Sequence, residues 1–479
     1  MQTKTETLGP MWLSILLGSS VVTAAPALSQ SPEGVWQSQG YGYVFEVTGS
    51  HLKAFEVTST TCVAGFTARL QPITTASEDS GGAAVFQSNE GDLFFIRAGG
   101  PKDHRLLHFE NSASDVRIDR METLPVVCER LTANTPADNF EVFTRTFAEH
   151  YISFDLKQKD WGKVVAEYRS KVTPRTTPAQ LFDIFEAMIR PLGDVHTSIS
   201  APKVHFRGIS TGREFEGIRP GTDRVLKGQS EGRFQKSGMP TLFAVTQHAY
   251  LRGPVRNFCR GKIQYGHIDA KTGYLRIVAF GGYTKSNDFA AGLTALDAAL
   301  DEIFSDPMLG ALVVDVRINF GGSYRYEMAI SSRLATSEYL AYTIQARSDP
   351  IDRNKWTPSF PIMVQPSSRP RFRGPVVELI GPYTLSAGET FTQGLMGRTP
   401  RVTRIGENTQ GVFSDVLARR LPNGWTYGLP NEVCRTADGT AFDGLGIPPD
   451  INVPVFADAD VAAGKDPAME KAIQILGKH

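Results

Sequence analysis

Two segments of the chain carry residue types that could together perform acyl transfer. In residues 376–389 an apolar run leads into Ser386, whose hydroxyl could attack a carbonyl carbon while the Ala387 N–H faces the oxyanion that forms. Another apolar run ends in Gly321 and Gly322, either of which could supply a second N–H. Glycine suits that position because it lacks Cβ, so a substrate carbonyl can approach its backbone closely.

Both segments also allow a purely structural interpretation. Ser386 and Glu389 have the spacing of a capping box, in which the serine caps a helix and the glutamate reaches back to the serine amide. Gly321 and Gly322 could simply form a tight turn. A nucleophilic role for Ser386 therefore depends on finding a base.

The base for such a serine is predicted to be a histidine. No lysine occurs between Ala387 and Gly464, so a Ser/Lys pair with the lysine shortly downstream is excluded. Arginine stays protonated and cannot replace it. Of the nine histidines, His196 is the best placed, because it follows a predicted helix in a loop, residues 192–197, that could hold it against a cleft. The alternative for His196 is an exposed or locally bonded loop histidine.

The elements that would position these residues alternate between strands and helices. Apolar runs typical of buried strands are separated by segments with apolar residues every three or four positions, which predicts an α/β layer with mainly parallel strands. Ser386 and the glycine pair follow the carboxyl ends of two such strands, where open α/β sheets bind ligands. The predicted strands are 273–280, 311–316, 376–380 and 402–405, and the predicted helices are 289–304, 324–335 and 387–396.

The start of the chain is predicted to be a signal peptide, residues 1–27. A short polar segment with Lys4 precedes the apolar run 11–24, and small residues follow it. The run is shorter than the ~20 residues that a membrane span needs. We therefore expect an exported protein, secreted or periplasmic, without stable membrane insertion after signal removal. The alternative is a buried helix.

Four regions follow the predicted signal peptide. Residues 31–131 contain short apolar runs separated by turn residues, which predicts a small antiparallel β-barrel or sandwich. Residues 134–200 have a helical period and form a predicted helical subdomain that carries His196. Residues 201–264 give a poor signal and are expected to be an irregular connecting region. Residues 265–479 form the α/β core with a C-terminal helix.

Composition and cysteine content exclude several classes of site. The 50 Lys+Arg balance 50 Asp+Glu in 479 residues, so nucleic acid is not an expected partner. The four cysteines have no metal-ligand spacing, so no zinc site is expected. In an oxidising compartment, Cys62 with Cys128 and Cys259 with Cys434 is one of three possible disulfide pairings. The alternative is reduced cysteines in the core.

Five motifs in one order resemble the tail-specific, or C-terminal-processing, serine protease family, from about residue 134 to the C-terminal helix. The resemblance implies a crotonase-like or ClpP-like α/β core and a serine peptidase acting on peptides or proteins, without metal or organic cofactor. Residues 194–197 resemble the family's histidine motif. The five motifs are residues 273–277, 315–322, 384–389, 405–411 and 444–450.

Within that family the chain resembles the branch of the tricorn protease core and the interphotoreceptor retinoid-binding protein modules. Ordinary members have a lysine where this chain has Val412, whereas in that branch a serine and a histidine come from distant segments. Asp443 falls where the family usually shows a glutamate that helps to orient the histidine. Glu432 is the second candidate, and the alternative for Asp443 is a simple turn. Residues 201–262 contain no recognisable PDZ module.

Two other functions stay open. Because retinoid-binding relatives are not proteases, the chain could be a catalytically silent secreted protein that binds lipid or peptide on the same scaffold. An acyl-CoA enzyme on a crotonase-like core is less favoured, since export removes the protein from acyl-CoA pools. No oligomeric state is predicted.

Overall fold

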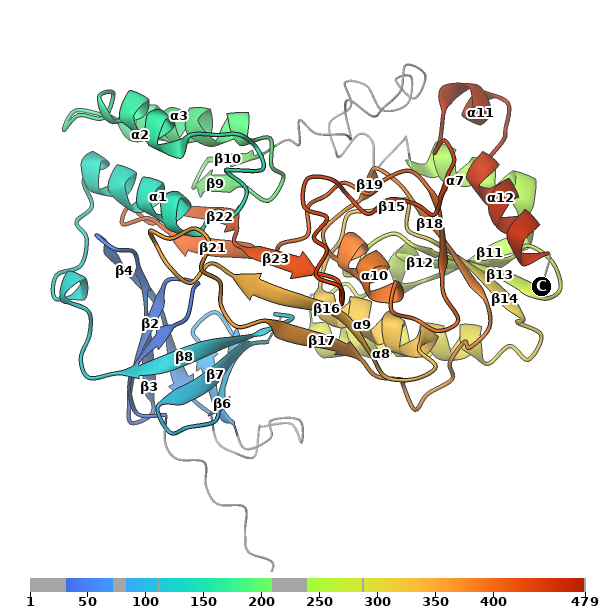
Figure 1. Cartoon of the computed structure of the whole chain (residues 1–479), viewed down its shortest axis with the longest axis horizontal. Coiled ribbons are helices and arrows are strands. Elements are labelled where there is room, and N and C mark those ends of the chain that lie inside the picture. The colour runs from blue at the N-terminus through green and yellow to red at the C-terminus, as the bar shows by residue number, and fades with distance from the viewer. Residues whose placement is uncertain (1–31, 72–82, 111, 209–238, 287, 478–479) are drawn as a thin grey trace, which may run out of the picture.

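The computed structural model describes residues 32–71, 83–110, 112–208, 239–286 and 288–477. The predicted signal peptide, residues 1–27, lies outside the described residues. The chain forms two lobes, one containing a β-barrel and a helical region and the other an α/β layer (Figure 1). Within the described ranges, no helix combines the length and apolar character needed to cross a membrane.

The N-terminal region is a closed antiparallel barrel in which each strand pairs with its neighbour and β1 pairs with β8. Its interior is filled by large side chains such as Trp36, Phe45 and Phe86. The predicted barrel or sandwich is therefore confirmed as a barrel. The strands are β1 (Gly34–Ser38), β2 (Tyr43–Thr48), β3 (His51–Val57), β4 (Cys62–Leu70), β5 (Ala84–Ser88), β6 (Leu93–Ala98), β7 (His104–Phe109) and β8 (Asp115–Met121).

One of the two expected disulfides is present. Cys62 at the start of β4 is bonded to Cys128, which follows the barrel. Cys259 and Cys434 are buried and free, so their predicted pairing is wrong. The reason is spatial, because Cys259 packs in the core under the α/β sheet whereas Cys434 packs in a separate cluster.

The helical region combines three helices with strands from distant parts of the chain. The first and third helices begin behind the capping residues Thr135 and Thr177, each followed by proline. They pack on a four-stranded sheet of order β10-β9-β22-β21, so the helical subdomain expected over 134–200 shares its core with a later hairpin. The elements are α1 (Pro136–His150), α2 (Trp161–Arg169), α3 (Pro178–Ile189), β9 (Ser198–Ala201), β10 (Val204–Arg207), β21 (Val416–Arg420) and β22 (Thr426–Pro430).

The second lobe is built on a seven-stranded sheet of order β11-β12-β13-β14-β18-β20-β24. Its strands from β13 to β24 are parallel, which confirms the predicted α/β alternation. Helices α8, α9 and α10 pack on one face and α12 on the other. The bounds are β11 (Arg252–Phe258), β12 (Ile263–His267), β13 (Thr272–Ile277), α8 (Phe289–Phe304), β14 (Ala311–Asp315), α9 (Tyr324–Leu334), β18 (Val376–Ile380), α10 (Ala387–Leu395), β20 (Thr403–Gly406), β24 (Ile451–Asn452), α11 (Asp458–Ala462) and α12 (Pro467–Leu476).

The expectation of an irregular region over 201–264 is wrong where the structure describes it. That region contains β10, α7 (Met239–Tyr250) and β11, while residues 209–238 lie outside the described part. Strand β11 lies at the edge of the sheet and most of its residues are exposed. It therefore lacks the buried apolar pattern that indicates a strand in sequence.

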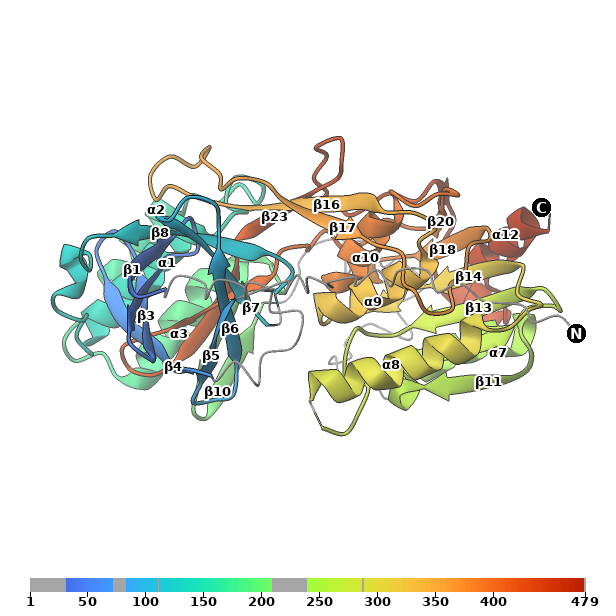
Figure 2. The same cartoon turned by 90° about the horizontal axis from the view of Figure 1, so that it is seen from below.

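A narrow three-stranded sheet connects the two lobes (Figures 1 and 2). Its central strand β16 (Tyr339–Ala346) pairs with β17 (Phe360–Val364) and β23 (Glu432–Arg435). Because β23 directly follows β22 of the helical region, the sheet joins that region to the α/β lobe. A short parallel pair, β15 (Ile318–Asn319) and β19 (Tyr383–Thr384), lies next to the two predicted catalytic segments.

Candidate active site

Ser386 occupies a strained turn between β19 and α10. Its backbone angles are φ 56° and ψ −127°, a conformation that non-glycine residues rarely adopt. Its side chain makes no capping hydrogen bond. The Glu389 carboxylate instead accepts the N–H groups of Gly411 and Val412, each at 2.6 Å. The capping-box interpretation is therefore wrong, and the helix does not use the Ser386 hydroxyl.

The glycine pair lies directly against this turn. Gly321 has φ 79°, and a Cβ there would meet the Ser386 Cβ at 2.6 Å. Gly322 has φ 138°, and a Cβ there would meet the Phe280 carbonyl oxygen at 2.2 Å. Positive φ and close backbone approach both require glycine at these positions.

The two glycines differ in the availability of their N–H groups. Gly321 donates its N–H to the Asn319 side-chain oxygen at 2.8 Å. Among the described residues, neither Gly322 nor Ala387 donates a backbone hydrogen bond. Of the two predicted glycine donors, Gly322 is thus the one left available beside Ala387.

Asn319 is a site residue that the sequence analysis missed. Its carbonyl accepts the Leu385 N–H at 3.1 Å, and its side chain holds Gly321 as described above. It is fully buried, and it also donates to the Ile277 carbonyl at 2.9 Å. Asn319 therefore fastens the glycine loop to the serine turn. The only sequence signal for it is its place just before the glycine pair.

A short segment, residues 411–414, connects the candidate residues. The Ser386 N–H donates to the Val412 carbonyl at 3.0 Å. A lysine at this position would be within reach of Ser386, but here the side chain is an isopropyl group. The Gly444 N–H donates to the Gly411 carbonyl at 2.7 Å, which brings Asp443 to the same segment.

His196 approaches the other end of this segment. It is 6% exposed, and its backbone N–H donates to Asp194 Oδ1 at 3.0 Å. The imidazole lies close to the backbone of Ser414, and its Nδ1 has no partner among the described residues. Burial lowers the pKa of His196 to about 4, so the ring is neutral at neutral pH.

The contacts of Ser386 and His196 are close together along the chain. The Ser386 N–H donates to the Val412 carbonyl, and the His196 ring lies close to the backbone of Ser414, two residues further on. Two residues span at most about 7 Å. Two parts of the sequence 190 positions apart therefore meet at one short segment.

The two candidate acids occupy different surroundings. Burial, together with the charge of Asp194, raises the pKa of Asp443 to about 7, and the backbone of Phe413 lies close to its carboxyl group. Asp443 Oδ2 is buried without a partner. Glu432 instead accepts the Tyr41 hydroxyl at 2.6 Å, and burial with the charge of Asp415 raises its pKa to about 7. Asp443 is thus the acid that borders the His196 loop.

Comparisons with known proteins identify the family. The model of peptidase family S41 matches residues 271–453, and the tricorn protease C1 domain matches residues 132–190. The chain belongs to the tail-specific protease family. It is a serine peptidase.

Two solved structures show the same fold as this peptidase. A candidate peptidase from Parabacteroides merdae is 23% identical, with a TM-score of 0.56, over 72% of this chain and 97% of that one. Mature CPAF is 13% identical, with a TM-score of 0.50, over 71% of this chain and 96% of that one. No curated protein matches the chain in sequence.

A cavity of about 70 Å³ opens beside Ser386 of the peptidase. It includes Gly322 and Ala387, whose N–H groups are available, and Glu432. The other lining residues are Ala113, Tyr324, Tyr342, Ile344, Thr390, Phe413, Asp415 and Cys434.

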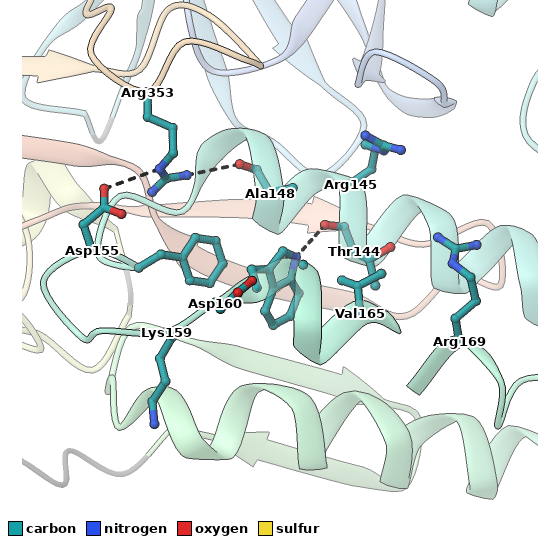
Figure 3. Close-up of a pocket in the computed structure, with 12 residues that line it drawn as sticks. Thr144, Arg145, Ala148, Asp155, Lys159, Asp160, Val165, Arg169 and Arg353 are labelled. Carbon is teal, nitrogen blue, oxygen red and sulfur yellow. Dashed lines mark hydrogen bonds and ion pairs between the residues drawn. The ribbon is translucent and has the colours of Figure 1, made fainter. Parts of the chain in front are cut away.

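A larger cavity, of about 500 Å³, lies in the helical region and contains none of the predicted site residues. Figure 3 shows its polar rim, where Arg353 contacts Asp155 and the Ala148 carbonyl. Trp161, which also lines the cavity, donates its ring N–H to the Thr144 carbonyl at 2.9 Å. In the described ranges, no three His, Cys, Asp or Glu side chains are grouped so that they could hold a metal ion.

Proposed function

We propose that this peptidase hydrolyses peptide bonds with Ser386 as nucleophile and His196 as general base. The observation that carries the proposal is the Ser386 turn, where a strained serine without a capping bond adjoins two available N–H groups. A hydroxyl held this way can attack a carbonyl whose developing charge is stabilised by Gly322 and Ala387. Gly321 does not donate to the oxyanion, because its N–H already donates to the Asn319 side chain. Its role is to let the glycine loop lie directly against Ser386.

His196 takes the proton from Ser386 and returns it to the leaving amine. A neutral imidazole is required for the first step, and burial keeps His196 neutral at pH 7. Ser386 and His196 both contact the segment 411–414, which supports placing their side chains close together. Lysine cannot fill this role at position 412, where valine stands.

Asp443 is the acid that orients His196 in this proposal. Asp443 Oδ2 and His196 Nδ1 are both buried without partners, and their residues border Phe413 and Ser414, which are adjacent. A hydrogen bond between these two atoms would satisfy both and fix the ring for proton transfer. Glu432 belongs to the cavity wall instead.

Labelling with a fluorophosphonate probe tests the nucleophile. We expect the wild type and a matched control, Ser170→Ala at an exposed position after α2, to be labelled, and Ser386→Ala and His196→Ala to lose labelling. No labelling of folded wild type would contradict the proposal and favour the silent binding protein for lipid or peptide.

We also propose that the peptidase is exported, to the periplasm or the exterior of the cell. The Cys62–Cys128 disulfide supports this, because disulfides persist in oxidising compartments. Mass spectrometry of the mature protein should find an N-terminus close after Ala27. A cytosolic protein that retains residues 1–27 would contradict the proposal.

A further inference from the structure

The small cavity beside Ser386 lies where a substrate side chain would enter. Gly322 and Ala387, which provide the candidate oxyanion donors, line one side of it together with Ser386. A carbonyl carbon bonded to the Ser386 oxygen would therefore carry its own side chain at the opening of this cavity. The cavity is a candidate specificity pocket for the residue that contributes the scissile carbonyl.

The walls of the cavity suit an aliphatic chain. Tyr342, Phe413 and Ile344 are between 1% and 4% exposed and present ring faces and methyl groups. Tyr324 adds a further ring, which packs edge-on against Tyr342. Methylene groups of a substrate side chain would be removed from water on these surfaces.

Two carboxyl groups contribute the polar part of the lining. Glu432 is 5% exposed, whereas Asp415 is exposed as a residue although partial burial of its carboxyl group raises its pKa. Among the described residues that line the cavity, none is lysine, arginine or histidine. The Cys434 thiol, in the same lining, has a pKa raised by burial and by several surrounding carboxylates, including Glu432. The cavity thus becomes negative as its two carboxyl groups ionise, and no lining cation offsets that charge.

The size of the cavity limits the side chain that fits. One water-sized atom needs about 10–15 Å³ of such space, so a cavity of about 70 Å³ holds roughly five to seven non-hydrogen atoms. Beyond Cα, a lysine side chain has five such atoms and an arginine side chain has seven. Both basic side chains therefore fit the available space.

We propose that this cavity binds the lysine or arginine side chain of the residue whose carbonyl Ser386 attacks. The proposal rests on the proposed function, since it gives the substrate class of the same site. The aliphatic stem packs on Tyr342 and Phe413, and the cationic end pairs with Glu432 and Asp415. A buried cation is stable only with such a partner.

The barrel contributes to the same cavity. Ala113, from the connection between β7 and β8, is part of the lining, and the Tyr41 hydroxyl donates to Glu432 Oε1 at 2.6 Å. Tyr41 does not line the cavity and acts through Glu432, so it is a positioning residue. The pocket is therefore complete only when the barrel is docked.

Single-residue coumarin amides test the proposal, because their leaving group is constant and only the residue before the scissile bond varies. We expect kcat/KM for lysine or arginine to exceed that for norleucine by about tenfold or more, and glutamate to be cleaved least. Glu432→Gln and Asp415→Asn should reduce this ratio to about threefold or less. Glu167→Gln, at an exposed position of α2, is the matched control and should keep it.

Parallel fluorophosphonate labelling separates this proposal from the proposed function. Labelled wild type without a preference for basic residues overturns the pocket proposal and leaves the serine mechanism intact. An absence of both labelling and turnover in folded protein overturns both. If Glu432→Gln does not fold, the exposed Asp415→Asn still gives the ratio. A preference for basic residues only after the scissile bond, seen in longer peptides, also overturns the assignment.

Discussion

At Asp443, burial determines when the group proposed to orient His196 carries a charge. Its pKa is raised to about 7, so below pH 7 the carboxyl is protonated and cannot stabilise an imidazolium. We therefore expect kcat/KM for a norleucine substrate to fall as pH drops from 8 to 6. In Asp443→Asn this fall should disappear, and activity at pH 8 should be lower by about 10²–10⁴-fold.

The matched control is Glu432→Gln, because burial raises the Glu432 pKa to the same range. It should keep the fall in kcat/KM between pH 8 and 6 if Asp443 causes it. The charge of Asp194 raises the pKa of Asp443 and the charge of Arg435 lowers it, while the charge of Asp443 raises the pKa of Glu389. A pH profile that is unchanged in Asp443→Asn and lost in Glu432→Gln would assign the orienting role to Glu432 instead.

Among the elements, α10 covers β18, and the contact between them contains the buried carboxyl group of Glu378. The Thr392 hydroxyl donates to Glu378 Oε1 at 2.8 Å, while Oε2 has no partner among the described residues. Burial raises the pKa of Glu378 to about 7. A raised carboxyl pKa stabilises the folded state below about pH 4.5, and this stabilisation is lost as pH rises to 7.

Glu378→Gln should remove this titration while keeping the size of the side chain. Relative to wild type, we expect its free energy of unfolding to rise by about 2–3 kcal/mol between pH 5 and pH 8. Urea unfolding at the two pH values measures this difference. A difference between variant and wild type that stays constant with pH would show that Glu378 does not titrate in the folded protein.

The elements also show what a single sequence can reveal. Strands β14 and β18 were predictable because every residue in each is buried and all but one residue of each, Asp315 and Glu378, are apolar. Strand β11 was not, because it is an exposed edge. The packing of β21 and β22 in the helical region depends on contacts with distant helices, for which no local pattern exists.

In the candidate site, too, some features could be predicted from the sequence and others depend on three-dimensional contacts. Residue type and motif order pointed to Ser386, His196 and the glycine pair, but the spacing of Ser386 and Glu389 also matches a capping box. Only the backbone angle of Ser386 and the partners of Glu389 separate the two interpretations. Cysteine count likewise could not separate a disulfide at Cys259 from a free thiol, because pairing depends on distance.

Over the whole molecule, the barrel is fastened to the hairpin that leads into the site. The Arg419 side chain of β21 donates to the Tyr41 carbonyl, and the Arg420 N–H donates to the Glu56 carboxylate at 2.7 Å. The Tyr41 hydroxyl reaches Glu432 in the next strand, β23. A domain without candidate catalytic residues thus sets the environment of a carboxylate in the substrate cavity.

Tyr41→Phe tests this coupling. A hydrogen bond from Tyr41 favours the charged form of Glu432 and lowers its pKa, so its loss should leave Glu432 less ionised at pH 7.5. We expect the ratio of kcat/KM for lysine over norleucine substrates to fall about fivefold to tenfold at pH 7.5 and to recover at pH 9.

Three groups near Glu432 affect how its carboxyl group ionises, and therefore the lysine-to-norleucine ratio: Asp415, Tyr41 and the Cys434 thiol. Tyr43→Phe is the matched control, because the Tyr43 hydroxyl, in the same part of the barrel, contacts the Ala418 carbonyl and not Glu432. It should keep the wild-type ratio at both pH values. A loss in Tyr41→Phe that persists at pH 9 would mean that the tyrosine shapes the cavity without controlling the Glu432 charge.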